Sequence, residues 1–162
     1  MKDIAKQVIE ELRLKGLHIS TAESCTGGMV AAAIVDVSGA SDVFEEGYIT
    51  YSDRVKQKVL GVDADLLEKY TAVSSEAAVK MAEGAANVSE ADIAVSVTGY
   101  AGPYDGDDGT KAGTVYIGTF YKGTSRADKF LFKGGRTSVR EQSVDKALEL
   151  VFERLKEELT RH

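Results

Sequence analysis

Apolar positions in this chain alternate between the spacing of helices and the spacing of strands. Near the start they recur every three or four positions until Gly16, which predicts a helix with an inward face of Ile4, Ala5, Val8, Ile9 and Leu12. The segment from Leu17 to Ser20 alternates apolar and polar residues and predicts a strand. An apolar run then predicts a helix over residues 27–37, ended by Ser38 and Gly39.

The rest of the chain continues this alternation. Strands are predicted over residues 44–51, 93–97, 113–121 and 129–132, and the apolar character of 93–97 is typical of a buried central strand. Polar capping residues predict that helices begin after Ser52, Asp63 and Ser74. Ser138 and Glu141 have the spacing of a capping box. The last helix then turns five apolar residues inward: Val144, Leu148, Val151, Leu155 and Leu159.

Helices that follow strands in this way place a sheet between two helical layers. The last two predicted strands flank the short segment Lys122-Gly123-Thr124, as the strands of a hairpin do, so at least one pairing is antiparallel and the sheet is mixed. No internal repeat or linker interrupts the pattern. The sequence therefore predicts a single α/β domain over residues 1–162.

Composition narrows the class of protein. The chain has 162 residues, 43% of them hydrophobic and 28% charged, which suits a globular domain with a core of its own. The formal net charge of -6 argues against a nucleic-acid partner. No apolar run reaches the ~20 residues of a membrane span, and no signal peptide is visible, so we expect a cytoplasmic protein without a membrane partner. The single cysteine, Cys25, cannot form an internal disulfide.

Candidate chemistry begins with the run TAESCTGG at 21–28, between the first predicted strand and the second helix. A strand, a polar turn and a glycine-opened helix gather backbone N–H groups around a side-chain oxygen. This suits anion binding or stabilisation of an acyl-transfer intermediate. Ser24 would then be the nucleophile, with N–H donors at Thr26, Gly27 and Gly28. A simple helix cap explains the same run without catalysis, and the run alone does not decide between the two.

Two further polar clusters are expected at the same edge of the sheet. The segment TGYAGP at 98–103 directly follows the apolar central strand, where ligands of open α/β sheets bind. The segment from Gly134 to Arg140 combines a helix start with the guanidinium groups of Arg136 and Arg140. It favours contact with a phosphate group over an ordinary capped surface loop.

The residues available for catalysis limit the mechanism. The two histidines, at positions 18 and 162, are poorly placed to serve Ser24, which argues against a Ser-His-Asp triad. A serine nucleophile would then need Lys, Tyr or a carboxylate as its base. Lys56 is one candidate, because its helix is expected beside the first strand. Glu23 competes with it, although on an extended chain it is expected to point away from Ser24.

Two other features stay ambiguous in the sequence. Cys25 is either a rival nucleophile or a small buried packing residue. The acidic loop DGDDG at 105–109 lacks the distal Glu of a calcium loop, and the few scattered Cys and His residues do not suit zinc, so no metal is expected. Tyr100 and Tyr104 flank this loop and either stack on a ligand ring or pack against the protein.

Six segments, in order, resemble the CinA C-terminal domain family. They are TAESCTGG at 21–28, GYITYSDRVKQKVLGV at 47–62, AVSSEAAVKMAEGA at 72–85, SVTGYAGP at 96–103, KAGTVYIG at 111–118 and FKGGRTSVREQ at 132–142. The family includes amidases that hydrolyse nicotinamide mononucleotide to nicotinic acid mononucleotide and ammonia. The resemblance implies a three-layer α/β/α sandwich with a mixed, mostly parallel sheet. It also implies a stand-alone form of this domain, a homo-oligomer, and no cofactor.

The matching motifs imply roles for individual residues. Ser24 is implied as the nucleophile and Lys56 as its base, while Arg136 and Arg140 are implied in a binding or electrostatic role. We expect these two arginines to bind the 5′-phosphate. Further substrate contacts are expected from loop residues that match the same motifs: Thr26, Gly27, Gly28, Tyr51, Thr98, Gly99 and Gly102. Asp53 departs from the family pattern, which usually has Asn at this position.

Two other functions stay open at this point. A noncatalytic protein that binds pyridine nucleotides would use the same loops and arginines without releasing ammonia. An RNA-binding module is suggested only by the family fold, which is related in shape to anticodon-binding domains. The acidic net charge and the lack of a Lys/Arg stripe argue against RNA.

Overall fold

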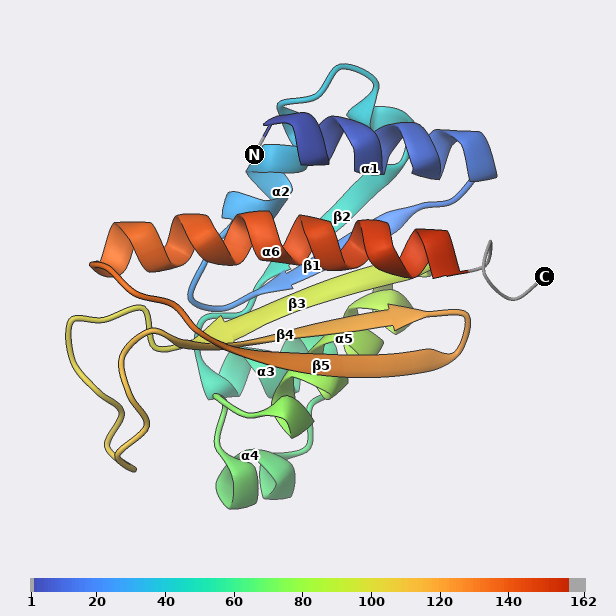
Figure 1. Cartoon of the computed structure of the whole chain (residues 1–162). Helices are drawn as coiled ribbons and strands as arrows, with labels where there is room; N and C mark the ends of the chain where they lie inside the picture. The colour runs from blue at the N-terminus through green and yellow to red at the C-terminus, as the bar shows by residue number, and fades with distance from the viewer. Residues whose placement is uncertain (1, 158–162) are drawn as a thin grey trace.

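The computed structural model of the chain describes residues 2–157 and is built around one five-stranded sheet (Figure 1). The strand order is β2-β1-β3-β4-β5. The strands are β1 (Ile19–Glu23), β2 (Phe44–Ile49), β3 (Ile93–Gly99), β4 (Thr114–Tyr121) and β5 (Thr124–Leu131). The predictions for Leu159 and for the histidine at position 162 lie outside the described residues.

The sheet is mixed, as predicted. Strand β1 pairs in parallel with β2 and with β3, whereas β4 is antiparallel to both β3 and β5. Only β4 therefore runs against the other strands, although parallel and antiparallel pairings are equal in number. This arrangement brings the carboxyl ends of β1, β2 and β3 to one edge of the sheet, where open α/β sheets bind ligands.

Helices cover both faces of the sheet and complete a three-layer sandwich (Figure 1). One layer contains α1 (Lys2–Lys15), α2 (Met29–Val35) and α6 (Arg136–Lys156), and the other contains α3 (Asp53–Leu60), α4 (Ala64–Tyr70) and α5 (Ser75–Ser89). A short 3-10 turn, η1 (Ala40–Asp42), precedes β2. Each layer has its own apolar core, and removal of this surface from water is the main force that holds the layers together.

Polar caps fix where three helices begin, as the sequence predicts. The side chains of Ser52, Asp63 and Ser74 accept hydrogen bonds from backbone N–H groups in the first turns of α3, α4 and α5. The prediction at Ser138 is wrong, because α6 already begins at Arg136 and its N-cap is Gly135, without a side-chain bond. Helix α2 also begins later than predicted, at Met29, since Gly27 and Gly28 adopt left-handed conformations with φ of 56° and 107°.

Strand β5 is longer than predicted and begins at Thr124 instead of residue 129. It is an edge strand whose outward positions are polar, so residues 124–128 lack the apolar signal on which the prediction depended. The turn before it places Lys122 and Gly123 at φ of 52° and 74°. Two successive positive φ values are typical of the tight turn that joins a twisted hairpin.

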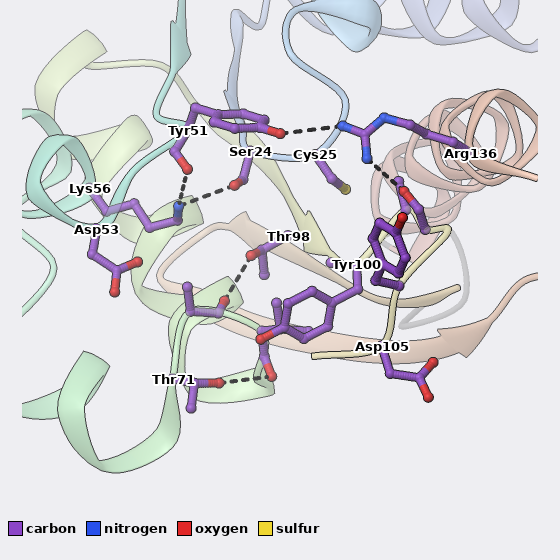
Figure 2. A pocket seen from close by; sticks show the side chains of 16 residues that line it. Ser24, Cys25, Tyr51, Asp53, Lys56, Thr71, Thr98, Tyr100, Asp105 and Arg136 are labelled. Atoms are coloured by element: carbon purple, nitrogen blue, oxygen red, sulfur yellow. Dashed lines mark hydrogen bonds between the residues drawn. The ribbon is translucent and has the colours of Figure 1, made fainter. Parts of the chain in front are cut away.

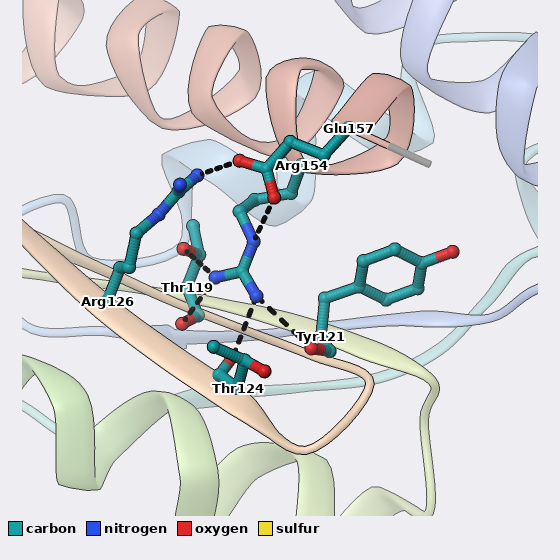
Figure 3. A network of polar contacts seen from close by, with 6 residues as sticks. All are labelled: Thr119, Tyr121, Thr124, Arg126, Arg154 and Glu157. Atoms are coloured by element: carbon teal, nitrogen blue, oxygen red, sulfur yellow. Dashed lines mark hydrogen bonds and ion pairs between the residues drawn. The ribbon is translucent and has the colours of Figure 1, made fainter. Parts of the chain in front are cut away.

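A buried arginine ties the end of α6 to this hairpin (Figure 3). Arg154 is 2% exposed. Its guanidinium donates to Thr119 Oγ1 at 2.8 Å, to the carbonyl of Tyr121 at 3.1 Å and to the carbonyl of Thr124 at 2.7 Å. Glu157 lies 3.6 Å from Arg154 Nε. Helix α6, which carries Arg136 at its start, is thus anchored to the sheet at its far end.

Candidate active site

The nucleophile candidate Ser24 lies directly after β1, at the carboxyl edge of the sheet. Its backbone N–H donates to the carbonyl of Val97 in β3 at 2.9 Å, so the loop is still anchored to the central strands. The residue is only 8% exposed, but it lines a cavity of about 500 Å³. The turn over residues 24–28 then leads into α2, so Ser24 occupies the strand-to-helix position expected from the sequence.

Lys56 approaches Ser24 from the neighbouring helix α3. Its Nζ lies 3.1 Å from Ser24 Oγ and 3.4 Å from the carbonyl oxygen of Tyr51 (Figure 2). It also donates to the carbonyl of Thr50 at 2.8 Å. Lys56 is 1% exposed, and burial lowers the pKa of its ammonium group below the ordinary value of 10.5, while the charges of Asp53 and Cys25 oppose this shift. A buried amine with a lowered pKa, within hydrogen-bonding distance of a hydroxyl, can take the proton of that hydroxyl.

Glu23, the competing base, and Cys25, the competing nucleophile, are both poorly suited to catalysis in the structure. The carboxylate of Glu23 accepts hydrogen bonds from Thr26 Oγ1 at 2.7 Å, from Val30 N at 2.8 Å and from Ala31 N at 3.0 Å. It therefore caps α2 and points away from the Ser24 hydroxyl, as expected. Burial raises the pKa of the Cys25 thiol to about 11, which leaves little of the reactive thiolate at neutral pH.

The three polar clusters do converge on one cavity. Seven of the predicted site residues line it: Ser24, Tyr51, Lys56, Thr98, Gly99, Gly102 and Arg136. The other four lie outside its lining: Thr26, Gly27, Gly28 and Arg140.

Arg136 forms one side of the cavity together with Tyr51 (Figure 2). As the first residue of α6, it donates from Nη1 to the carbonyl of Gly102 at 2.8 Å and from Nη2 to the Tyr51 hydroxyl at 3.3 Å. Its guanidinium and the tyrosine hydroxyl both remain near solvent, since both residues are exposed. A guanidinium of this kind at a helix start can bind a phosphate group.

The loop after β3 shapes the floor of the cavity. The Thr98 hydroxyl donates to the carbonyl of Ala72 at 2.7 Å and holds the segment before α5 against the strand. Gly99 packs so closely that an added Cβ would lie 2.6 Å from the carbonyl oxygen of Thr114. Gly102 has a φ of 104° and precedes Pro103 through a cis peptide bond. This left-handed position suits glycine, and it directs the Gly102 carbonyl toward Arg136.

Arg140 lies one turn after Arg136 but reaches a different target. Its Nε donates to the carbonyl of Cys25 at 2.9 Å, and its Nη2 contacts the carbonyl of Thr26 at 3.3 Å. Arg140 therefore holds the back of the nucleophile loop. Because a trans peptide is planar, a Cys25 carbonyl that points toward Arg140 directs the Thr26 N–H to the opposite side.

This orientation bears on which N–H group could stabilise an oxyanion. The Gly27 N–H already donates to the carbonyl of Ser24 at 3.1 Å. Within residues 2–157, by contrast, the Thr26 N–H has no hydrogen-bond acceptor. Of the three donors that the sequence suggested, the Gly27 N–H is thus occupied, while those of Thr26 and Gly28 make no hydrogen bond within residues 2–157.

Asp53 is a cavity residue that the sequence reasoning did not include in the site. It begins α3, three residues before Lys56, and its side chain lines the cavity beside the amine (Figure 2). The spacing of three positions on a predicted helix was the signal that could have identified it, because residues so spaced lie on the same helix face.

Other kinds of site find no support in the described part of the chain. Residues 2–157 contain no group of three or more His, Cys, Asp or Glu side chains that could hold a metal ion. His18 lies at the opposite end of β1 from Ser24, where its backbone N–H donates to Asp92. None of the described helices is both long and apolar enough to cross a membrane.

Similarity to known proteins extends along most of the chain. The sequence model of a family described as "CinA C-terminal domain" matches residues 1–155. A CinA-like protein from Kosmotoga olearia is 46% identical over 144 residues, which cover 89% of this chain and 35% of that protein. A CinA-like protein from Akkermansia muciniphila is 44% identical over 146 residues, which cover 90% of this chain and 35% of that protein. The chain thus spans about a third of the length of these curated relatives.

Solved structures show the same fold over nearly their full length. A competence-damaged protein (CinA) superfamily protein from Klebsiella pneumoniae has a TM-score of 0.93 and 36% identity, and the match covers 95% of this chain and 96% of that one. The competence/damage inducible protein CihA from Agrobacterium tumefaciens has a TM-score of 0.91 and 37% identity, with 96% and 95% covered. Sequence and structure together show that this chain belongs to the CinA C-terminal domain family, which includes nicotinamide mononucleotide amidases.

Proposed function

We propose that this protein hydrolyses the carboxamide of nicotinamide mononucleotide and releases nicotinic acid mononucleotide and ammonia. The observation that carries the proposal is the 3.1 Å contact between Ser24 Oγ and the buried amine of Lys56 at a cavity. Membership of a family that includes such amidases supports the choice of substrate. The proposed site consists of the catalytic residues Ser24 and Lys56 and the cavity residues around them.

The first half of the reaction forms an ester on Ser24. Neutral Lys56 takes the proton of the Ser24 hydroxyl as Oγ bonds to the carboxamide carbon, and the carbonyl oxygen becomes an oxyanion. Lys56 then returns this proton to the amide nitrogen, the C–N bond breaks, and ammonia leaves. The exposed guanidinium of Arg136, supported by Tyr51, is the proposed contact for the 5′-phosphate.

The second half of the reaction regenerates the enzyme. Water attacks the ester carbon while Lys56 takes one of its protons, and that proton returns to Ser24 Oγ as the ester breaks. In both halves the Thr26 N–H is the proposed oxyanion donor, and Arg140 acts as a positioning residue that holds its peptide from behind. Thr98, Gly99 and Gly102 shape the floor that faces the pyridine and the ribose.

The direct test is ammonia release from nicotinamide mononucleotide, with the nucleotide product identified by chromatography. We expect activity in the wild type and a loss of at least about a thousandfold in Ser24→Ala, whereas Cys25→Ala stays active. Undiminished activity in Ser24→Ala would refute the proposal. Tight binding of the mononucleotide by the wild type without any ammonia release would instead identify a noncatalytic protein that binds pyridine nucleotides.

A further inference from the structure

The cavity carries opposite charges on two sides. Arg136 lies on one side and Asp53 on the other, with Ser24 between them (Figure 2). A second carboxylate, Asp105, also lines the cavity, but its Oδ1 accepts from Ala112 N at 2.8 Å and its Oδ2 lies 3.8 Å from Lys111 Nζ. The charge of Asp105 is therefore engaged within its own loop.

Asp53 has no such partner. Across the described residues 2–157, its carboxylate makes no hydrogen bond and no ion pair, although Asp53 lines the cavity. Its charge opposes the lowering of the Lys56 pKa by burial, and it adds to the rise in the Tyr100 pKa that burial, Asp108 and Asp107 produce. Its field therefore reaches both the amine and the aromatic ring.

The reaction leaves this charge uncompensated at the moment when the substrate binds. Lys56 must be neutral to accept the proton of Ser24, and a neutral amine does not balance the carboxylate of Asp53. The reactive cavity is then negative on the Asp53 side and positive on the Arg136 side. A ligand that complements it has a cationic group near Ser24 and an anionic group farther along.

We propose that Asp53 is a specificity residue that selects ligands with a cationic aromatic ring, a pyridinium, over a neutral ring of the same shape. This inference rests on the proposed function, because attack by Ser24 on the carboxamide fixes where the ring lies. The tyrosine ring of Tyr100, which lines the same cavity, would add to the preference, since aromatic faces attract cations.

A matched pair of ligands tests this directly: nicotinamide mononucleotide and its reduced dihydro form, which has the same carboxamide and phosphate but an uncharged ring. Dissociation constants are measured by calorimetry in the Ser24→Ala background, where neither ligand is consumed. Replacement Asp53→Asn should weaken binding of the pyridinium form about three- to fivefold and change binding of the dihydro form less than about twofold. The preference for the pyridinium form should also decrease as salt is added, because salt screens the attraction between exposed charges.

Asp36→Asn is the matched control, since Asp36 is an exposed carboxylate at the end of α2 that does not line the cavity. It should leave both constants unchanged. Equal changes for the two ligands in Asp53→Asn, or no change for either, would overturn the inference while ammonia release by the wild type still upheld the proposed function. If the wild type neither binds the mononucleotide nor releases ammonia, the proposed function and this inference fall together.

Discussion

The amine of Lys56 is buried, whereas the other lysines whose side chains the structure describes are at least partly exposed. Burial of a charged ammonium is unfavourable, and the hydrogen-bond partners of the amine are neutral oxygens: Ser24 Oγ and the carbonyls of Thr50 and Tyr51. None of these partners is an anion that would keep the amine charged. Burial therefore lowers the pKa of Lys56 and shifts the amine toward its neutral form, which is the form that a general base requires.

The charge of Asp53 should set the pH range of the reaction. Burial lowers the Lys56 pKa and Asp53 raises it again, so Asp53→Asn removes the opposing effect and lowers the pKa further. Because Lys56 is active when neutral, the acid limb of the kcat/KM profile should move to lower pH in this variant. The profile is measured with ammonia release, and Asp36→Asn should leave it in place. An unmoved limb, or one shifted to higher pH, would contradict this assignment.

Arg136 and Arg140 should affect different kinetic constants. Arg136→Met removes an exposed guanidinium from the cavity and should raise KM for the mononucleotide about tenfold or more, with a smaller effect on kcat. Arg140→Met releases the carbonyls of the nucleophile loop and should lower kcat by about tenfold or more at nearly constant KM. A rise in KM alone for Arg140→Met would assign it to phosphate binding, the role expected from the sequence.

The two arginines also show where sequence reasoning stops at the residue scale. The strand-to-helix turn and the pairing of sequential strands made Ser24 and Lys56 candidates, and the resemblance to the CinA family implied their roles. Arg136 and Arg140 lie four positions apart and share a helix face, which suggested a common target. One helical turn separates them by about 6 Å, enough for one to reach the cavity and the other to reach the loop behind it.

At the scale of elements, the contact between α3 and α5 positions Lys56. Gly84 in α5 lies against the end of α3, and an added Cβ would clash with the carbonyl oxygen of Leu60. Only glycine lets the two helices approach so closely. Because Gly84 has no side chain, α5 packs directly against α3, and this contact fixes the position of the helix that carries Lys56.

Gly84→Ala should therefore destabilise the protein, although alanine is the better helix former by about 1 kcal/mol. We expect a loss of about 1–3 kcal/mol in the free energy of unfolding, measured with urea, together with reduced ammonia release as α3 shifts. Asn87→Ala, on the exposed side of the same helix, is the control and should be neutral or slightly stabilising. A stabilised Gly84→Ala variant with full activity would show that this contact is not tight.

Elements with an apolar face and a polar cap could be predicted from the sequence, as α3, α4 and α5 show. The ends of elements could not be predicted where residues of another element, or backbone groups alone, determine them. The N-terminus of α2 is capped by Glu23, which belongs to the preceding strand, and the N-cap of α6 is Gly135, which has no side chain to cap it. The prediction for strand β5 is too short because the first half of this strand is polar and lies on an exposed edge of the sheet.

At the scale of the whole molecule, Arg154 joins the last helix to the hairpin at the edge of the sheet (Figure 3). Arg154→Met should lower the free energy of unfolding by about 2–4 kcal/mol, because the carbonyls of Tyr121 and Thr124 lose a buried charged donor. The kcat and KM of the folded protein should stay nearly unchanged, since Arg154 lies far from the cavity lining.

Arg126→Met is the control for this prediction. Arg126 pairs with Glu157 at the surface and is 45% exposed, so its removal should change stability by less than about 1 kcal/mol. Both variants are compared by urea unfolding at one pH. Equal stabilities for the two variants would mean that the buried network contributes no more than a surface ion pair.

The overall architecture follows from the alternation of helices and strands, which predicts two helical layers around a mixed sheet. The strand order does not follow from it. Insertion of β1 between β2 and β3 brings the loops after these strands to one edge, and the start of α6 adds Arg136 there through its bond to Gly102. This arrangement depends on contacts between segments far apart in the sequence. Those contacts turn three separate polar motifs into one cavity.

The measurement that tests the central claim most directly is the activity of Lys56→Met, a substitution that keeps an unbranched side chain of similar length. We predict that ammonia release from nicotinamide mononucleotide falls at least about a hundredfold. In the Ser24→Ala background, where the ligand is not consumed, Lys56→Met should change the dissociation constant by less than about threefold. Lys58→Ala, an exposed lysine on the same helix, should keep full activity. If Lys56→Met released ammonia at the wild-type rate, the buried amine would not be the base, and the proposed mechanism would be wrong.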